Sequence, residues 1–151
     1  SQVIENEKGT IRFTLNGADQ RSTLAGHFIS ESFGSSVQHI AFASSDIFRT
    51  AEALRATGFK FLEISANYFA DLQARFGLAD EFVARLKAGN ILYDRDGDGE
   101  YFQLYSSLYG DGFFFEIVER RGGYNGYGAP NAQFRIAAQK RSLRDRKIPA
   151  R

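Results

Sequence analysis

The stretch that most constrains this chain is GFFFEIVER, residues 112–120. Side chains alternate between the two sides of a strand, so Phe114, Glu116 and Val118 share one largely apolar face. The pattern therefore predicts a strand that buries a carboxylate. Because an ionised carboxylate that is buried without a partner costs several kcal/mol, Glu116 requires a metal ion, an arginine or lysine, or protonation with a raised pKa.

A second stretch, VQHIAF at residues 37–42, places His39 on an apolar strand face. An imidazole and a carboxylate on two inner strands supply two ligands of a site with two histidines and one carboxylate, which is a ligand set for Fe(II) or another divalent ion. Two ordinary interpretations stay open. Glu116 could form an ion pair with Arg12 or Arg135, and His39 could be a hydrogen-bonded core histidine.

The third ligand of such a site has no clear candidate in the sequence. The chain contains two histidines, and the other one, His27, lies in residues 22–32. This segment is predicted to be a short helix or an ordered loop, in which a solvent-facing histidine is favoured. Either the missing histidine lies outside this chain, or the site is incomplete.

Length and composition predict a single globular domain. The chain has 151 residues, of which 43% are hydrophobic, and this share is sufficient for a core. Its 19 basic and 18 acidic side chains nearly balance, so nothing global favours a nucleic-acid or membrane partner. The lack of cysteine excludes disulfides and thiolate ligands and is consistent with a cytoplasmic protein.

Hydrophobic periodicity and turn residues predict the order of the elements. A strand over 11–16 is followed, from residue 37 onward, by a strand, a helix, a strand, a helical insertion and three strands. The expected elements are a strand at 37–42, a helix capped among Ser44, Ser45 and Asp46 that ends at Gly58, a strand at 59–64, a helix capped by Asn67 that runs through 76, a helix from 80 that ends before Gly89, strands at 91–94 and 101–105 around a hairpin loop at 95–99, the strand at 112–120, and a helix from 131 to about 144.

This order describes an α+β fold: a βαβββ module with one preceding strand and a helical insertion. Residues 1–10 are expected to be a linker from a longer chain, 11–145 the module, and 146–151 a tail. A single βαβββ sheet exposes a large apolar face. We therefore expect it to pair with another such unit, in the same chain or in a homodimer.

Three polar features have ordinary interpretations as well. DRDGDG at 94–99 begins like a calcium loop, but Tyr105 occupies the position of the bidentate glutamate, so this loop is interpreted as a turn. The loop at 122–128 lacks a following Lys-Ser/Thr and is interpreted as a flexible lid. Gln103, which shares a strand face with Tyr101 and Tyr105, either satisfies nearby backbone or donates to a ligand beside the metal.

Five segments occur in order along the chain: VQHIA at 37–41, LRATG at 54–58, NYFADLQAR at 67–75, FQLY at 102–105 and FFFEIVER at 113–120. Together they resemble the C-terminal domain of 4-hydroxyphenylpyruvate dioxygenase, over about residues 11–139. That family belongs to the vicinal oxygen chelate superfamily, which includes glyoxalase-like proteins. The resemblance implies that two βαβββ modules pair to form a cup around a metal ion.

The resemblance implies specific roles. His39 matches the second iron histidine and Glu116 the iron carboxylate, so Fe(II), or another divalent metal, is the implied cofactor. The first iron histidine belongs to the preceding module, which is the implied partner of this one. The implied substrate contacts are Gln103, Asn16, Phe114, Gln38, Tyr105 and Tyr127.

The chain also departs from the family at the pocket. Ala132 stands where the family has a phenylalanine, and Tyr105 and Tyr127 stand at phenylalanine positions. The family's Ser-Gln-Ile segment reads STL at residues 22–24. Losing a phenyl ring and gaining hydroxyl groups makes the pocket more polar and less suited to clamp a phenol ring.

Residues 90–105 and 127–132 are more similar to a divergent branch, in which the dioxygenase-like domain follows a sugar-phosphate-isomerase-like barrel. Those bacterial fusion proteins are associated with 3-dehydroshikimate dehydration. We expect the chain to be the C-terminal part of a metal-dependent dioxygenase. Such an enzyme would act on a 2-oxo acid by oxidative decarboxylation. The alternative is a metal-binding, dimerising or stabilising domain of a bifunctional 3-dehydroshikimate dehydratase.

Overall fold

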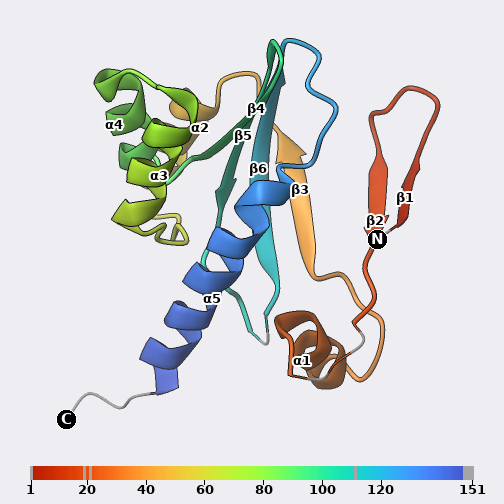
Figure 1. Ribbon diagram of the computed structural model, residues 1–151. Helices are drawn as coiled ribbons and strands as arrows, with labels where there is room; N and C mark the ends of the chain where they lie inside the picture. The colour runs from red at the N-terminus through yellow and green to blue at the C-terminus, as the bar shows by residue number, and fades with distance from the viewer. Residues whose placement is uncertain (1, 19, 21, 111, 148–151) are drawn as a thin grey trace. The chain divides into compact units, whose positions relative to one another are not determined.

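The computed structural model describes residues 2–18, 20, 22–110 and 112–147. The chain forms two compact units, Ser1–Gln38 and His39–Arg151, and Figure 1 shows the elements of each. Within the described residues, no helix has both the length and the apolar composition to cross a bilayer.

The first unit consists of a hairpin and a helix. Strands β1 (Gln2–Glu5) and β2 (Arg12–Leu15) pair in antiparallel fashion, and Arg12 Nε donates to Glu5 Oε2 at 2.8 Å. Helix α1 (Leu24–Glu31) begins after Thr23, whose hydroxyl oxygen accepts a hydrogen bond from the Gly26 N–H. Strand β2 and helix α1 match the predictions for 11–16 and 22–32. Strand β1 lies in the stretch predicted to be a linker.

The second unit is built on a four-stranded mixed sheet with the order β3-β6-β5-β4. Its strands are β3 (His39–Ala43), β4 (Leu92–Asp96), β5 (Gly99–Tyr105) and β6 (Phe114–Arg121). Strand β3 is parallel to β6, whereas β5 is antiparallel to both of its neighbours. The predicted α+β class is confirmed.

The helices of this unit lie at different places along the sheet. They are α2 (Ile47–Ala56), α3 (Ala66–Phe76), α4 (Asp80–Ala88), the short 3-10 helix η1 (Ala129–Asn131) and α5 (Ala132–Lys147). Helices α2, α3 and α4 gather on one side of the sheet, and α5 crosses the strands separately (Figure 1). Helix α3 also packs directly against α5, since the rings of Tyr68 and Phe134 meet with centroids 4.8 Å apart.

Helix α2 is held at its N-terminus by two carboxylates. Asp46 Oδ1 accepts from the Arg49 N–H at 3.0 Å, so Asp46 is the one of the three predicted cap residues that caps this helix. Glu119 of β6 is buried, and its Oε2 accepts from the Ile47 N–H at 2.7 Å. Arg121 Nε donates to the other oxygen of Glu119 at 2.6 Å. The buried charge of Glu119 is thus neutralised by an ion pair and by the N-terminal end of the helix.

Three local predictions were wrong. Residues 59–64 form no strand, because their pairing is confined to a bridge between Phe61 and Ser106 and to single bonds such as Leu62 N–H to Tyr105 O. Helix α3 begins after Ser65, so Asn67 lies inside its first turn rather than at its cap. The hairpin loop is shorter than 95–99, because Asp96 already pairs with Gly99 in a two-residue turn.

The core between the sheet and helices α2 to α4 is aromatic. Phe102 of β5 is fully buried, and edge-to-face contacts join its ring to Phe48, Phe82 and Tyr93, with centroids 5.1 to 6.3 Å apart. Such pairs stabilise a core by about 0.5–1.5 kcal/mol beyond the area that they bury. Phe102 therefore joins the sheet to the helical insertion.

Replacing Phe102 with alanine is expected to lower the free energy of unfolding by about 3–5 kcal/mol, because it leaves a cavity where several rings meet. Urea unfolding followed by circular dichroism measures the change. Phe33→Ala is the matched control, since Phe33 is 99% exposed, and it should change stability by less than about 0.5 kcal/mol. Equal losses in the two variants would contradict this account of the core.

Candidate functional site

The parallel pairing of β3 with β6 brings the two predicted metal ligands together. Ala41 stands opposite Glu116, and His39 stands opposite Phe114. His39 Nε2 lies 3.5 Å from Glu116 Oε2. Glu116 is 7% exposed, whereas the His39 side chain is 30% exposed because β3 is the edge strand of this sheet. The imidazole is therefore half-buried rather than buried as predicted.

The surroundings of His39 favour its neutral form. Its ring stacks on Phe114, with centroids 4.8 Å apart and planes 6° apart. Burial lowers the pKa of His39, the Glu116 carboxylate raises it, and Arg135 lowers it, with burial the largest effect. A neutral imidazole keeps a nitrogen lone pair, which is what a metal ion binds.

Gln103 of β5 holds the carboxylate from the other side. Its Nε2 donates to Glu116 Oε1 at 2.9 Å and to the Tyr105 hydroxyl oxygen at 2.8 Å. Oxygen Oε1 of Glu116 is thus engaged by an amide, while Oε2 lies beside the His39 nitrogen. Since such hydrogen bonds orient a ligating carboxylate, Gln103 is suited to direct Oε2 toward a shared metal position.

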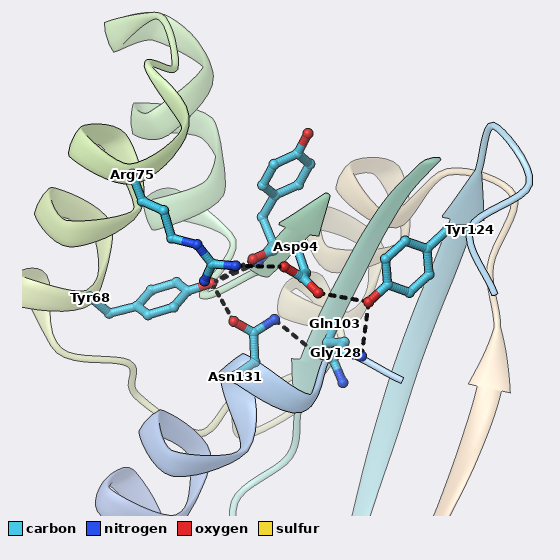
Figure 2. Close-up of polar contacts among 8 residues, drawn as sticks. Tyr68, Arg75, Asp94, Gln103, Tyr124, Gly128 and Asn131 are labelled. Atoms are coloured by element: carbon cyan, nitrogen blue, oxygen red, sulfur yellow. Dashed lines mark hydrogen bonds and ion pairs between the residues drawn. The ribbon is translucent and has the colours of Figure 1, made fainter. Parts of the chain in front are cut away.

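The orientation of the Gln103 amide is itself determined by a buried chain of hydrogen bonds (Figure 2). Asn131 Nδ2 donates to Gln103 Oε1 at 2.9 Å. The Tyr68 hydroxyl shares its proton between Asn131 Oδ1 at 3.0 Å and the Tyr93 carbonyl oxygen at 3.1 Å, and it accepts from the Tyr93 N–H at 2.8 Å. Burial raises the pKa of Tyr68 well above its ordinary value, so the hydroxyl keeps the proton that it donates. The chain runs from α3 through η1 to the sheet.

A second branch anchors the loop at 122–128, which the sequence predicts to be a flexible lid. The Tyr124 hydroxyl donates to Asp94 Oδ2 at 2.7 Å and accepts from the Gly128 N–H at 3.2 Å. Asp94 Oδ1 pairs with Arg75 Nη2 at 3.2 Å, as Figure 2 shows. Burial, followed by the hydrogen bond to Asp94, raises the pKa of Tyr124 to about 12. Tyr124 therefore ties this loop to the sheet.

Gly128 is required where the anchored loop passes Gln103. Its φ is 60°, a left-handed conformation that favours glycine, and a β-carbon there would overlap Gln103 Oε1. The backbone of the loop thus closes over the amide that orients Glu116. Any larger residue would displace either the loop or Gln103.

The remaining predicted site residues differ in their burial and in the unit to which they belong. Tyr105 is buried, and its ring meets Phe114 edge-on at 5.9 Å on the face of Glu116. Tyr127 is exposed, with the Arg120 guanidinium 5.9 Å from its ring. Asn16 and Gln38 belong to the unit Ser1–Gln38, whereas Glu116 belongs to the unit His39–Arg151. Their roles stay predictions.

The described residues include two side chains of the predicted metal-ligand types. Within them, no group of three or more histidine, cysteine, aspartate or glutamate side chains could hold a metal ion. The imidazole nitrogen of His39 and the carboxylate oxygen of Glu116 nevertheless fit a divalent ion in donor type and proximity. Arg135, one predicted ion-pair partner of Glu116, instead donates to Gln139 Oε1 at 2.8 Å.

Sequence reasoning missed Tyr68, Asn131 and Tyr124 as parts of the site. Asn131 lies 28 residues from Gln103 and 63 from Tyr68, and periodicity carries no information at such separations. One sequence feature pointed to this region, namely the polar and aromatic residues that cluster around Pro130. Their composition marks the region as a candidate for the site, but it does not identify the groups that these residues contact.

Similarity to known proteins extends over most of the chain. No family profile matches the chain. A 3-dehydroshikimate dehydratase of Pseudomonas putida is 43% identical over 143 residues, which are 94% of this chain and 22% of that protein. A 4-hydroxyphenylpyruvate dioxygenase of Legionella pneumophila is 31% identical over 144 residues, which are 93% of this chain and 41% of that protein.

The predicted resemblance is confirmed. Among solved structures, a xylose isomerase-like TIM barrel/4-hydroxyphenylpyruvate dioxygenase fusion protein matches with a TM-score of 0.79 and 43% identity, over 93% of this chain and 23% of that one. A mutant of 4-hydroxymandelate synthase from Streptomyces coelicolor matches with a TM-score of 0.74 and 28% identity, over 93% of this chain and 41% of that one. This chain therefore spans less than half the length of each of these relatives.

Replacing Asn131 with aspartate tests the buried chain of hydrogen bonds. A carboxylate cannot donate to Gln103 Oε1, and a flipped Gln103 amide would turn its oxygen toward Glu116. We expect a loss of about 1–3 kcal/mol in the free energy of unfolding at neutral pH. The same change at exposed Asn125 is the control and should have little effect.

The loss should depend on pH. Burial raises the folded-state pKa of the introduced carboxyl, so its ionisation opposes folding. The deficit should be small below about pH 3.9, the ordinary pKa of aspartate, and should grow as the pH rises through the folded-state pKa. Urea unfolding of both variants from acid to neutral pH measures it. A deficit that does not change with pH would contradict the proposed geometry.

Proposed function

We propose that residues 11–145 form a βαβββ module of the vicinal oxygen chelate type, in which His39 and Glu116 ligate Fe(II) or another divalent metal. An upstream module, or a second copy of the chain, supplies the remaining histidine. The observation that carries this proposal is the carboxylate of Glu116, which has one oxygen engaged by Gln103 and the other 3.5 Å from His39 Nε2. The name of the similar 4-hydroxyphenylpyruvate dioxygenase supports a dioxygenase-like site.

The proposed substrate is a 2-oxo acid, as in the name of the dioxygenase relative. When bound, the metal would supply Lewis acidity and reactivity with O2. Gln103 orients the Glu116 carboxylate, and Phe114 forms an apolar wall beside His39. Tyr105 stays protonated, because burial and the charge of Glu116 raise its pKa well above the ordinary value. Asn16, Gln38 and Tyr127 are proposed substrate contacts on the strength of the resemblance.

A second candidate function has support of its own. The dehydratase of Pseudomonas putida and the barrel fusion are each 43% identical to this chain. Ala132 removes a ring that would clamp a phenol. In this alternative, the domain keeps the fold and the metal ligands but serves a dehydratase barrel as a binding, dimerising or stabilising module.

The metal ligands are tested by elemental analysis of the full-length protein and of Glu116→Gln. The wild type should carry close to one metal ion per chain, and the variant should lose nearly all of it, because a neutral amide is a poor ligand for a hard divalent cation. Glu52→Gln, an exposed change on α2, should retain the metal. Equal metal content in the two variants would remove Glu116 from the site.

Oxygen consumption separates the two candidate functions. The full-length protein, loaded with Fe(II), is mixed with 4-hydroxyphenylpyruvate in an oxygen electrode. Uptake that is abolished by Glu116→Gln would support the dioxygenase. Metal binding without uptake would remove the dioxygenase function for that substrate and favour the module that serves the barrel.

A further inference from the structure

Helix α5 places a cation on the sheet face that carries the proposed ligands. The guanidinium carbon of Arg135 lies 5.2 Å from the centre of the Phe114 ring and 5.7 Å from that of Tyr105. Phe114 itself stacks on His39, and Tyr105 shares the amide of Gln103 with Glu116. Arg135 therefore lies beside both the aromatic wall and the ligands of the site.

The charge of Arg135 is not neutralised by an ion pair within the part of the chain that the structure describes. Its contacts there are with neutral groups: the Phe114 and Tyr105 rings and the Oε1 atom of Gln139, to which its Nη1 donates at 2.8 Å. A guanidinium carries five N–H donors in a planar fork suited to carboxylates. Arg135 thus has donors to spare for a ligand.

Gln139, one turn further along α5, adds a second unfulfilled donor. The side chain is 3% exposed, and its Nε2 has no acceptor among the described residues. The hydrogen bond from Arg135 holds the amide oxygen toward the guanidinium, which prevents the amide from turning to seek another acceptor. A buried donor without an acceptor is costly unless a ligand supplies one.

The residue one turn before Arg135 on α5 has a small side chain. Ala132 precedes it by three residues and therefore lies on the same side of α5, one turn earlier. Its methyl group takes far less room than any of the aromatic side chains that line the sheet face. A ligand group that approached Arg135 from this direction would meet no bulky residue at position 132.

We propose that Arg135, assisted by Gln139, binds a second anionic group of the ligand, so that the site takes a dianionic 2-oxo acid in preference to a monoanionic one. This inference rests on the proposed function. A divalent ion, the Glu116 carboxylate and the Arg135 guanidinium sum to two positive charges when the ligating His39 is neutral. A dianion neutralises that sum, whereas a monoanion leaves one charge uncompensated.

Calorimetric titration of the full-length, Fe(II)-loaded protein without oxygen tests the preference. Two matched pairs of probes differ by one carboxylate: 2-oxoglutarate with 2-oxopentanoate, and 4-carboxyphenylpyruvate with 4-hydroxyphenylpyruvate. We expect at least one dianion to bind about tenfold or more tightly than its partner, since a charge-assisted bond contributes that much. Equal binding within both pairs would overturn the inference.

Substitutions at position 135 test whether Arg135 causes the preference for a dianion. Arg135→Gln should abolish it by weakening the dianion about tenfold or more while changing the monoanion less than about threefold. Arg135→Lys, which keeps the charge, should restore part of it, and Arg144→Gln, at an exposed position of the same helix, should leave it intact. Thermal unfolding identifies any loss that reflects folding. A preference that survives in Arg135→Gln would overturn the inference.

The failure of this inference is distinguishable from failure of the proposed function. If elemental analysis finds no metal, the proposed function fails, and the same titrations of metal-free protein still compare Arg135→Gln with the wild type. If metal binds and oxygen is consumed but neither dianion is preferred, the inference about Arg135 fails alone.

Discussion

The structure depends on how one buried carboxylate is satisfied. Glu116 lies in the middle of β6, where an unpaired charge would oppose folding strongly. Its two carboxylate oxygens have different neighbours. Gln103 donates a hydrogen bond to one, and His39 lies beside the other. This asymmetry leaves an acceptor next to an imidazole nitrogen. The same arrangement that satisfies the fold therefore also creates the donor pair on which the proposed function is built.

The rest of the second unit supports that arrangement at a distance. Tyr68 on α3 and Asn131 on η1 hold the Gln103 amide in one orientation, and Tyr124 ties the neighbouring loop to Asp94. Fully satisfied buried networks of this kind rigidify the groups that they connect. The helical insertion, whose Tyr68 also meets Phe134 of α5 with ring centroids 4.8 Å apart, thus has a role in positioning the site as well as in burying Phe102.

Much of this unit was predictable from local pattern. Alternation in residues 112–120 indicated which face of β6 carries Glu116, and the cap at Asp46 and the stop at Gly58 bounded the helix between them. The ordered segments also led to the resemblance that the comparisons confirm. The failures occurred where tertiary contacts override local preference. Residues 59–64 have the composition of a strand, but only Phe61 forms a bridge, with Ser106.

The α+β order of elements, the residue types of the proposed ligands and the polarity of their surroundings could be read from the amino-acid sequence, because these follow from periodicity and side-chain chemistry. Three relations became visible in the folded protein alone: His39 faces Glu116, Asn131 holds Gln103, and Arg135 stands over Phe114. These relations join positions on different elements, often tens of residues apart. Strand register and helix packing determine such distances, and neither is written in any local stretch of the chain.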